Sequence, residues 1–456
     1  MNNRQMREPH VGLAFSGRRR PGFDQDYGAR MEHQVRDSLR NRSFSVTEAR
    51  GKLVDEQSAR EILDQFRRAG VDVPLFLQCT MGDGRLAPTI AARWNSPVVL
   101  WATPENPEGA MISSCSLVGS HNWASIMIRS GLRPAVVYGD PQQPVTAAAV
   151  ETAIRSAFAA ACLQRSRLGV VGGAAPGFLA MEVDPFQLRG GLGVQHQSIS
   201  LAEFGAALGE IPEADVKADL AVALDLKLPL QDVVESDLVL QSRFYLVLKQ
   251  FFCAQGFDAL ALRCWPEIPN DFGQWPYLAM TRLADEGYAI AMEGDAYGAL
   301  GSYLAEQLGM GRCYISDWLA HDCNSVTLWH AGNLPFSLSP PVGTPGGPVV
   351  ARHFNVPRPA VIESTLQPGM PVTLFRIWHG ADGLQLVAME GTSIEPRRTL
   401  MGTNGLVMFE RRDIEAEFLR LVRAGMPHHV SLCKGHHAAR LAQAADLLGI
   451  RVTTAC

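Results

Sequence analysis

Short apolar runs alternate with amphipathic segments over the first third of the chain. Four runs have the length and apolar character of buried strands, at residues 11–15, 73–78, 97–101 and 135–138. Three segments between them repeat their apolar residues at helical spacing, at 25–39, 58–68 and 120–130. Strands that alternate with helices indicate a parallel sheet covered on both faces. We therefore predict an α/β domain over residues 1–145.

The same alternation starts again after an Ala-rich helix predicted at 147–165. Further apolar strands are predicted at 168–171, 259–264 and 288–292, with helices in the intervals. These elements predict a second α/β domain over residues 146–343.

From about residue 344 the pattern changes. Pro and Gly become frequent, and strands such as 371–376 and 384–390 follow one another after short turns. This pattern predicts a mostly β domain over residues 344–456. The predicted fold class is therefore α/β, with two Rossmann-like βα domains followed by a C-terminal antiparallel β-barrel-like domain.

Composition narrows the class of protein. The chain has 456 residues, of which 47% are hydrophobic and 19% charged, and its net charge is −5. We therefore expect no nucleic-acid partner and no membrane-surface partner. The sequence has no apolar run of about 18 residues or more and no apolar N-terminal core, so we expect neither a membrane span nor a signal peptide. Nine scattered cysteines without a CxxC pair indicate a reducing compartment, and we predict a cytoplasmic protein.

Two acids stand after apolar runs on either side of one predicted helix. Glu293 follows the strand at 288–292, Asp317 follows the run at 313–316, and the helix is predicted at 296–308. A strand–helix–strand unit would bring both strand ends to one edge of a sheet. Two carboxylates there can hold a divalent cation and also move protons. The alternative is that Glu293 or Asp295 only caps the helix.

Histidines offer further ligands. His330 ends an apolar run, where a satisfied structural histidine is the alternative. His428 and His429 precede the strand predicted at 430–433. Adjacent residues of a strand point to opposite faces, so we expect at most one ligand from this pair. Glu267 also follows a predicted strand and either lines the same cleft or is an exposed loop acid. Oxygen and imidazole ligands without thiolates suit Mn²⁺, Mg²⁺ or Co²⁺ better than structural zinc.

Several segments resemble the L-fucose/L-arabinose isomerase superfamily, and in particular its shorter L-fucose isomerase-like proteins. They lie at residues 257–267, 292–300, 316–318, 328–336 and 426–430. The step from Glu293 to Asp317 also matches the family. The resemblance implies a metal-dependent aldose–ketose isomerase in which Glu293, Asp317 and His429 bind Mn²⁺, with His330 as a weaker ligand. It further implies that Glu293 and Asp317 move the proton between C1 and C2 of a hexose or pentose through a cis-enediolate.

The resemblance also implies a homo-oligomer, commonly a hexamer, whose sites are completed by the first domain of a neighbouring subunit. Candidates for substrate binding are Arg19, His121, Trp123, Glu267, Trp275 and Asn333. The arginines at 18–20 would suit a substrate with an anionic tail, because guanidinium pairs bidentately with oxyanions. A solvated loop or an interface ion pair is the alternative. The candidate substrates are therefore L-fucose, D-arabinose, L-arabinose and a 6-sulfo sugar such as sulfoquinovose.

Two other classes of function stay open. A sugar-binding regulator on the same scaffold would bind without turnover, although simple sugar binding does not need paired acids at a metal position. A metal-dependent lyase or aldolase could use the same enediolate chemistry. Retro-aldol cleavage would release a shorter carbonyl compound, whereas isomerisation conserves mass, so the mass of the product separates the two.

Overall fold

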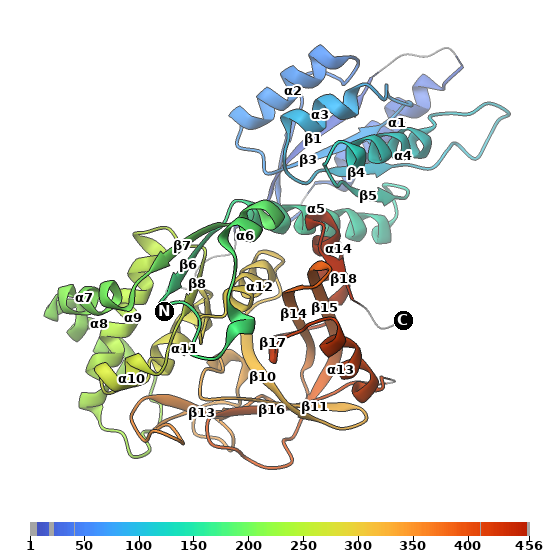
Figure 1. The fold of residues 1–456 in the computed structure, drawn as a ribbon. Helices are drawn as coiled ribbons and strands as arrows, with labels where there is room; N and C mark the ends of the chain where they lie inside the picture. Colours follow the sequence, from blue (N-terminus) through green and yellow to red (C-terminus); the bar gives the residue numbers. More distant parts are fainter. Residues whose placement is uncertain (1–6, 18–21, 41, 411, 454–456) are drawn as a thin grey trace. The chain divides into compact units, whose positions relative to one another are not determined.

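The computed structural model describes residues 7–17, 22–40, 42–410 and 412–453. They fall into two compact units. Unit 1 is built mainly from Arg165–Ala442, and unit 2 from Met6–Gln164 together with Gln443–Gly449. Among the described residues, the strands of unit 2 form a single sheet, separate from the sheets of unit 1 (Figure 1). Each unit has its own hydrophobic core.

Unit 2 is a parallel α/β layer structure. Among its described residues, five strands pair in parallel in the order β2-β1-β3-β4-β5. The strands are β1 (His10–Ser16), β2 (Ser45–Glu48), β3 (Val73–Gln78), β4 (Val99–Ala102) and β5 (Ala135–Tyr138). The helices are α1 (Gln25–Ser38), α2 (Glu56–Arg68), α3 (Leu86–Arg93), α4 (Ser116–Arg129) and α5 (Pro144–Gln164). The predicted parallel sheet is confirmed. Its edge strand β2 is largely exposed and polar, so no apolar run marked it.

Helix α5 is the one helix of the described residues that is long and apolar enough to cross a membrane by length and composition. About 67% of its most apolar window is buried inside the protein. The helix packs on β3, β4 and β5. A buried core helix passes the same test, so α5 is weak evidence for a span.

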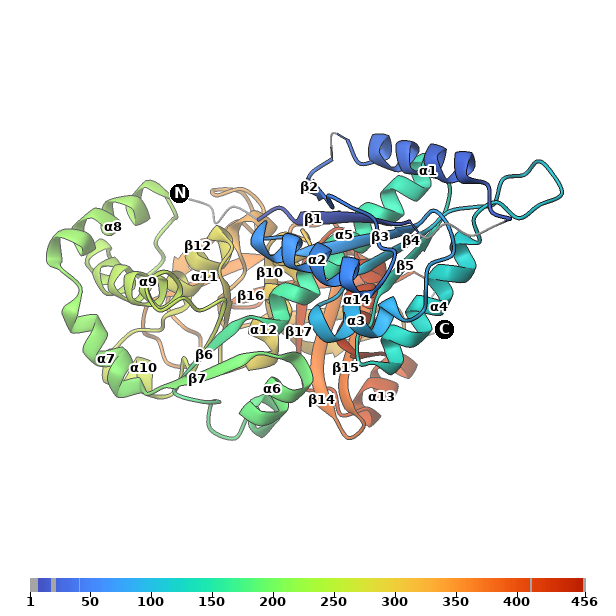
Figure 2. The ribbon, with the colours of Figure 1, turned by 90° about the horizontal axis from the view of Figure 1, so that it is seen from above.

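Unit 1 begins with a second parallel sheet. In its described part, four strands pair in the order β7-β6-β8-β9. They are β6 (Arg167–Val171), β7 (Gln195–Ile199), β8 (Ala259–Leu262) and β9 (Ala289–Ala291). The helices of this part are α6 (Pro185–Leu192), α7 (Leu201–Glu210), α8 (Glu213–Asp225), α9 (Leu238–Cys253), α10 (Glu267–Asp271), α11 (Tyr277–Glu286) and α12 (Ala296–Gln307). Helices α7 and α8 both pack on α9 (Figure 2). Short 3₁₀ helices lie at Leu179–Met181, Glu235–Asp237 and Phe336–Leu338.

The rest of unit 1 is a closed antiparallel barrel. Six strands of the described chain form it, in the order β16-β11-β10-β17-β14-β15, and pairing of β15 with β16 closes the ring. They are β10 (Cys313–His321), β11 (Ser325–His330), β14 (Pro371–Gly380), β15 (Gly383–Ile394), β16 (Thr403–Met408) and β17 (His429–Lys434). Strands β12 (Val349–Ala351), β13 (Val361–Thr365) and β18 (Arg451–Val452) extend the sheet. Helices α13 (Ile414–Arg423) and α14 (Ala438–Leu448) complete the chain's elements.

The predicted mixture of parallel α/β sheets and a β barrel is confirmed, but one local prediction is wrong. Strands β9 and β10 do not share a sheet edge, because β9 lies in the parallel sheet and β10 in the barrel. Helix α12 connects the two. Asp317 accordingly lies inside β10 and not at a strand end. Strands β10 and β11 precede residue 344 and already pair inside the barrel.

Candidate metal and catalytic site

Glu293 lies in a tight turn directly after β9. Its φ is 59°, which is rare for a residue with a side chain, and the next residue, Gly294, has φ 74°. The turn is fastened by Ala175 N, which donates to Glu293 O at 2.9 Å, and by Gly294 N, which donates to Leu262 O at 3.0 Å. A Cβ at Gly294 would lie 2.1 Å from Gly173 O. The glycine-rich loop at 172–177 therefore packs against the turn that carries Glu293.

His429 brings the two acids together. It is the first residue of β17 and is fully buried. Its Nε2 lies 3.1 Å from Glu293 Oε2 and 3.4 Å from Asp317 Oδ1. In the cross-strand register Asp317 is paired with His429. The barrel, and not a common sheet edge, is what carries Asp317 to Glu293.

Two further histidines flank this cluster. Ligand atoms of Glu293, His330 and His429 lie within 4.8 Å of one another, as do those of Asp317, His428 and His429. The His428 and His429 rings are 4.6 Å apart, so the two side chains are not on opposite faces as strand alternation predicts. The reason is that β17 starts at His429, which leaves His428 in the preceding turn.

A buried layer lies behind His429. Its Nδ1 is 3.0 Å from Asp295 Oδ2. Arg376 Nη1 and Nη2 donate to Asp295 at 2.5 and 2.8 Å, and both side chains are fully buried. From the sequence, Asp295 is expected only as a helix cap, and no role is predicted for Arg376. The available signal was the one charged residue among the buried positions of β14.

Burial and charge act against each other in this cluster. Burial raises the pKa of Glu293, but His429, His330 and the donor Trp265 outweigh it and hold that pKa at about 2. Burial lowers the pKa of His429, but the carboxylates of Asp295 and Glu293 outweigh it and raise that pKa to about 9. Burial lowers the pKa of His330. Without a cation, His429 therefore carries a proton between charged carboxylates.

The donor atoms fit a divalent cation. His429 Nε2 is buried and forms no hydrogen bond with acceptable geometry to any described residue, although two carboxylates surround it. The Nδ1 of His330 is likewise buried and lacks a hydrogen-bond partner among the described residues. Buried polar atoms normally have partners. Two carboxylates with imidazole are typical of Mn²⁺, Mg²⁺ or Co²⁺ sites.

The other predicted residues of unit 1 lie in its walls. Glu267 starts α10 and forms an ion pair with Arg263. Trp275 is buried; its ring stacks on that of His353 at 3.9 Å. Asn333 is buried and donates from Nδ2 to Ile315 O at 2.8 Å, while its Oδ1 has no described partner.

Glu293 also has a direct contact that the sequence does not predict. Trp265 Nε1 donates to Glu293 Oε1 at 2.7 Å. The Trp265 ring also meets Phe178 edge to face, and Phe178 in turn lies 5.1 Å from the His428 ring. Three aromatic rings therefore flank the acid cluster.

The predicted residues of unit 2 are placed differently. Arg19 lies outside the described residues. His121 is exposed on α4. Trp123 is fully buried in the core of unit 2, where it packs on Phe76 and donates to Asp83 O at 3.0 Å. Trp123 is thus part of the core of unit 2, and its role in substrate binding stays a prediction.

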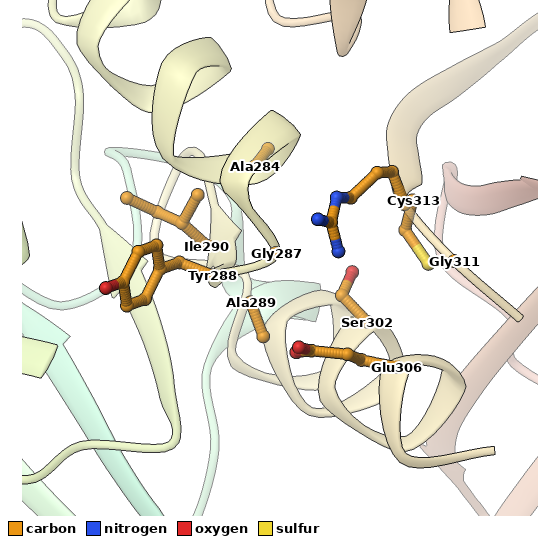
Figure 3. A pocket seen from close by; sticks show the side chains of 10 residues that line it. Ala284, Gly287, Tyr288, Ala289, Ile290, Ser302, Glu306, Gly311 and Cys313 are labelled. Carbon is orange, nitrogen blue, oxygen red and sulfur yellow. The ribbon is translucent and has the colours of Figure 1, made fainter. Parts of the chain in front are cut away.

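A separate small cavity of about 20 Å³ carries none of these groups. It is lined by residues of α11, β9, α12 and the start of β10, and by the turn between α11 and β9. Tyr288 of that turn and Ser302 and Glu306 of α12 are among them (Figure 3). Its volume is that of about one water molecule. The candidate site is the acid and histidine cluster.

The chain is similar in sequence to known sugar isomerases over most of its length. A sulfoquinovose isomerase from Priestia aryabhattai is 26% identical over 393 residues, which cover 85% of this chain and 86% of the relative. One from Alkalicoccus urumqiensis is 25% identical over 367 residues, covering 79% and 81%. The chain is a homologue of these sugar isomerases. The resemblance to fucose isomerase-like proteins and the prediction of an aldose–ketose isomerase are thereby confirmed.

Other comparisons add nothing to this assignment. No family model matches the chain. Among solved structures, a dTDP-4-dehydrorhamnose reductase from Bacillus anthracis aligns over 43% of this chain and 87% of its own, at 10% identity and a TM-score of 0.20. A likeness of that size carries no argument about fold or function.

Proposed function

We propose that the chain is a Mn²⁺-dependent isomerase that interconverts sulfoquinovose and its 2-ketose through a cis-enediolate. The observation that carries the proposal is the buried, unbonded Nε2 of His429 between the carboxylates of Glu293 and Asp317. The names of the relatives support the choice of sugar.

Glu293, Asp317 and His429 would hold the cation, with His330 as a weaker ligand. Mg²⁺ and Co²⁺ are substitutes with the same preference for oxygen and imidazole. A bound divalent cation polarises the carbonyl and the adjacent hydroxyl of the sugar and stabilises negative charge on their oxygens. The protein supplies the rest of the reaction.

Proton transfer between C1 and C2 is assigned to the two acids. Trp265 holds Oε1 of Glu293, and this contact orients the carboxylate. The side chain of Asp317 is 25% exposed and that of Glu293 is 11% exposed. Asp317 is therefore the acid more open to a ligand, whereas Glu293 is held more rigidly. General acid–base catalysis of this kind contributes roughly 10²–10⁴-fold to a rate.

Other residues would complete the sugar site. Glu267, Trp275 and Asn333 would shape the sugar site, and Asp317 with His428 would form its open side. Arg19 and His121 are proposed contributions from the first domain of a neighbouring subunit in a homo-oligomer, commonly a hexamer in this superfamily. Arginine at 18–20 would pair with the sulfonate. A cytoplasmic location is likewise proposed.

The proposal is tested by an aldose–ketose screen after EDTA treatment, with and without Mn²⁺. The panel contains sulfoquinovose, L-fucose, D-arabinose, L-arabinose, D-glucose and D-mannose. We expect Mn²⁺ to restore conversion of sulfoquinovose with its mass conserved, and D-glucose, which lacks the sulfonate, to react far more slowly. If D-glucose is converted as fast as sulfoquinovose, the sulfonate does not contribute to substrate recognition. A shorter carbonyl product would support a lyase instead.

A further inference from the structure

Asp295 connects three elements of unit 1. It stands directly before α12 and accepts a hydrogen bond from Gly298 N at 2.9 Å. It accepts two more from Arg376 of β14 and lies 3.0 Å from Nδ1 of His429 of β17. A Cβ at Gly298 would lie 2.3 Å from Asp295 Oδ2, so the glycine leaves room for the carboxylate.

A helix cap alone does not account for this arrangement. Capping requires one acceptor atom and is normally exposed, as in Asp413, which caps α13 from the surface. Asp295 is instead fully buried with a fully buried arginine. The desolvation of such a pair offsets most of its Coulombic gain, so the pair contributes little net stability. Its effect lies in fixing geometry.

That geometry determines which nitrogen of His429 carries hydrogen. Arg376 donates to both carboxylate oxygens of Asp295, and Gly298 N donates to Oδ1, which is how a guanidinium and a backbone N–H bind an ionised carboxylate. An ionised carboxylate can only accept hydrogen bonds. Nδ1 of His429 must therefore be the N–H donor, and the lone pair of Nε2 would be free to bind a cation that Glu293 and Asp317 also hold.

We propose that Asp295 and Arg376 are positioning residues that hold His429 in the Nδ1–H tautomer with Nε2 aimed at the cation. The inference rests on the proposed function, because it presumes a cation at Nε2. Asp295 touches neither substrate nor cation in this account. Arg376 acts one step further back, because it neutralises Asp295 and fixes both of its oxygens.

The test is Mn²⁺ binding to the purified full-length protein, measured by calorimetry and by the EPR signal of free Mn²⁺. Asp295→Asn keeps an acceptor for Gly298 N but also brings an amide donor, which favours the wrong tautomer. We expect its Mn²⁺ affinity to fall by roughly 10–100-fold. Asp413→Asn is the matched control, since it makes the same change at a surface cap, and should bind Mn²⁺ as the wild type does.

A second variant tests the inference independently in case Asp295→Asn does not fold. Arg376→Lys keeps the charge but loses the bidentate fork, and should weaken Mn²⁺ binding in the same direction. Melting temperatures without metal show whether each variant is folded. Wild-type affinity, within about twofold, in either folded variant would overturn the inference while leaving the proposed function intact. If His429→Gln binds Mn²⁺ as tightly as the wild type does, both the inference and the proposed function are overturned.

Discussion

Asp317 and His429 face each other across the antiparallel pair β10–β17, with Asp317 Oδ1 3.4 Å from His429 Nε2. The register of two barrel strands, and not a shared loop, fixes this distance. Glu293 approaches the same nitrogen to 3.1 Å from the parallel sheet. The candidate site thus lies where the parallel sheet of unit 1 meets its barrel.

Replacement of Glu293 by Gln should remove turnover while leaving the fold intact. The amide keeps the shape of the side chain but loses the negative charge that attracts a cation and the basic oxygen that takes up a proton. Loss of acid–base catalysis alone predicts a decrease of roughly 10²–10⁴-fold in kcat. Steady-state kinetics check the change, with Glu410→Gln, an exposed acid, as the control. If Glu293→Gln is as active as the wild type, the proposed mechanism is wrong.

The pKa of His429 predicts how stability depends on pH. In the folded protein this pKa is raised to about 9 by Asp295 and Glu293, whereas an unfolded histidine titrates near about 6.5. The raised pKa means that protonation stabilises the fold. This contribution is complete below pH about 6.5 and is lost as pH rises through about 9. For EDTA-treated protein we expect the Tm to fall over that window.

The comparison that isolates His429 is the wild type against His429→Gln over the same pH range. The difference between their Tm values should shrink as pH rises. Mn²⁺ competes with the proton on Nε2, so Mn²⁺ affinity of the wild type should increase over the same window. A difference in Tm that is constant from pH 6 to about 9.5 would contradict the assigned charge state.

Trp265→Phe should slow the reaction without unfolding the protein. The change removes the hydrogen bond from Nε1 to Glu293 Oε1 but keeps an aromatic ring against Phe178. A hydrogen bond to a charged group contributes about 1.5–3 kcal/mol. We expect kcat to fall by about 10-fold or more, because Glu293 is no longer oriented. The matched control is Trp329→Phe, which loses a donor to Met401 O instead. Equal kcat values in both variants would mean that orientation of Glu293 does not matter.

Gly294→Ala should damage the site more than its backbone strain explains. Its new Cβ would lie 2.1 Å from Gly173 O, so either the loop or the turn with Glu293 has to move. Gly369→Ala is the control, because its φ of 81° imposes a similar left-handed penalty but nothing lies within 4 Å of the new Cβ. That penalty is about 1–2 kcal/mol for either variant. We expect a larger loss of Tm and of Mn²⁺ affinity in Gly294→Ala, and equal losses would show that the close approach is unimportant.

Much of the fold follows from local patterns. Continuous apolar runs such as Val73–Gln78 indicate buried parallel strands, because both faces of such a sheet are covered. The end of β10 was misplaced because Asp317 is polar, and a polar residue after an apolar run resembles a strand end. Strand β10 pairs with its neighbour β11, but its other partner in the barrel is β17, more than a hundred residues later. No local pattern carries that information.

The candidate site divides in the same way. Glu293, Asp317, His330 and His429 were identified from residue type, position and family resemblance, and the structure brings them together. The partnership of Asp295 with Arg376 spans 81 positions, and the sequence around either residue does not reveal it. The burial of Trp123 is not predictable from its neighbours in the sequence either, because it depends on packing against Phe76 of another element.

The most direct test of the central claim is the ¹H NMR spectrum of sulfoquinovose in D₂O with EDTA-treated protein, before and after addition of Mn²⁺. The account predicts that Mn²⁺ starts interconversion with the 2-ketose and that deuterium enters C2 of the recovered sugar, because an acid of the protein removes the C2 proton, exchanges it with the solvent and returns a deuteron. Glu293→Gln should show neither change. Interconversion that proceeds equally well in EDTA and in Glu293→Gln would contradict the account.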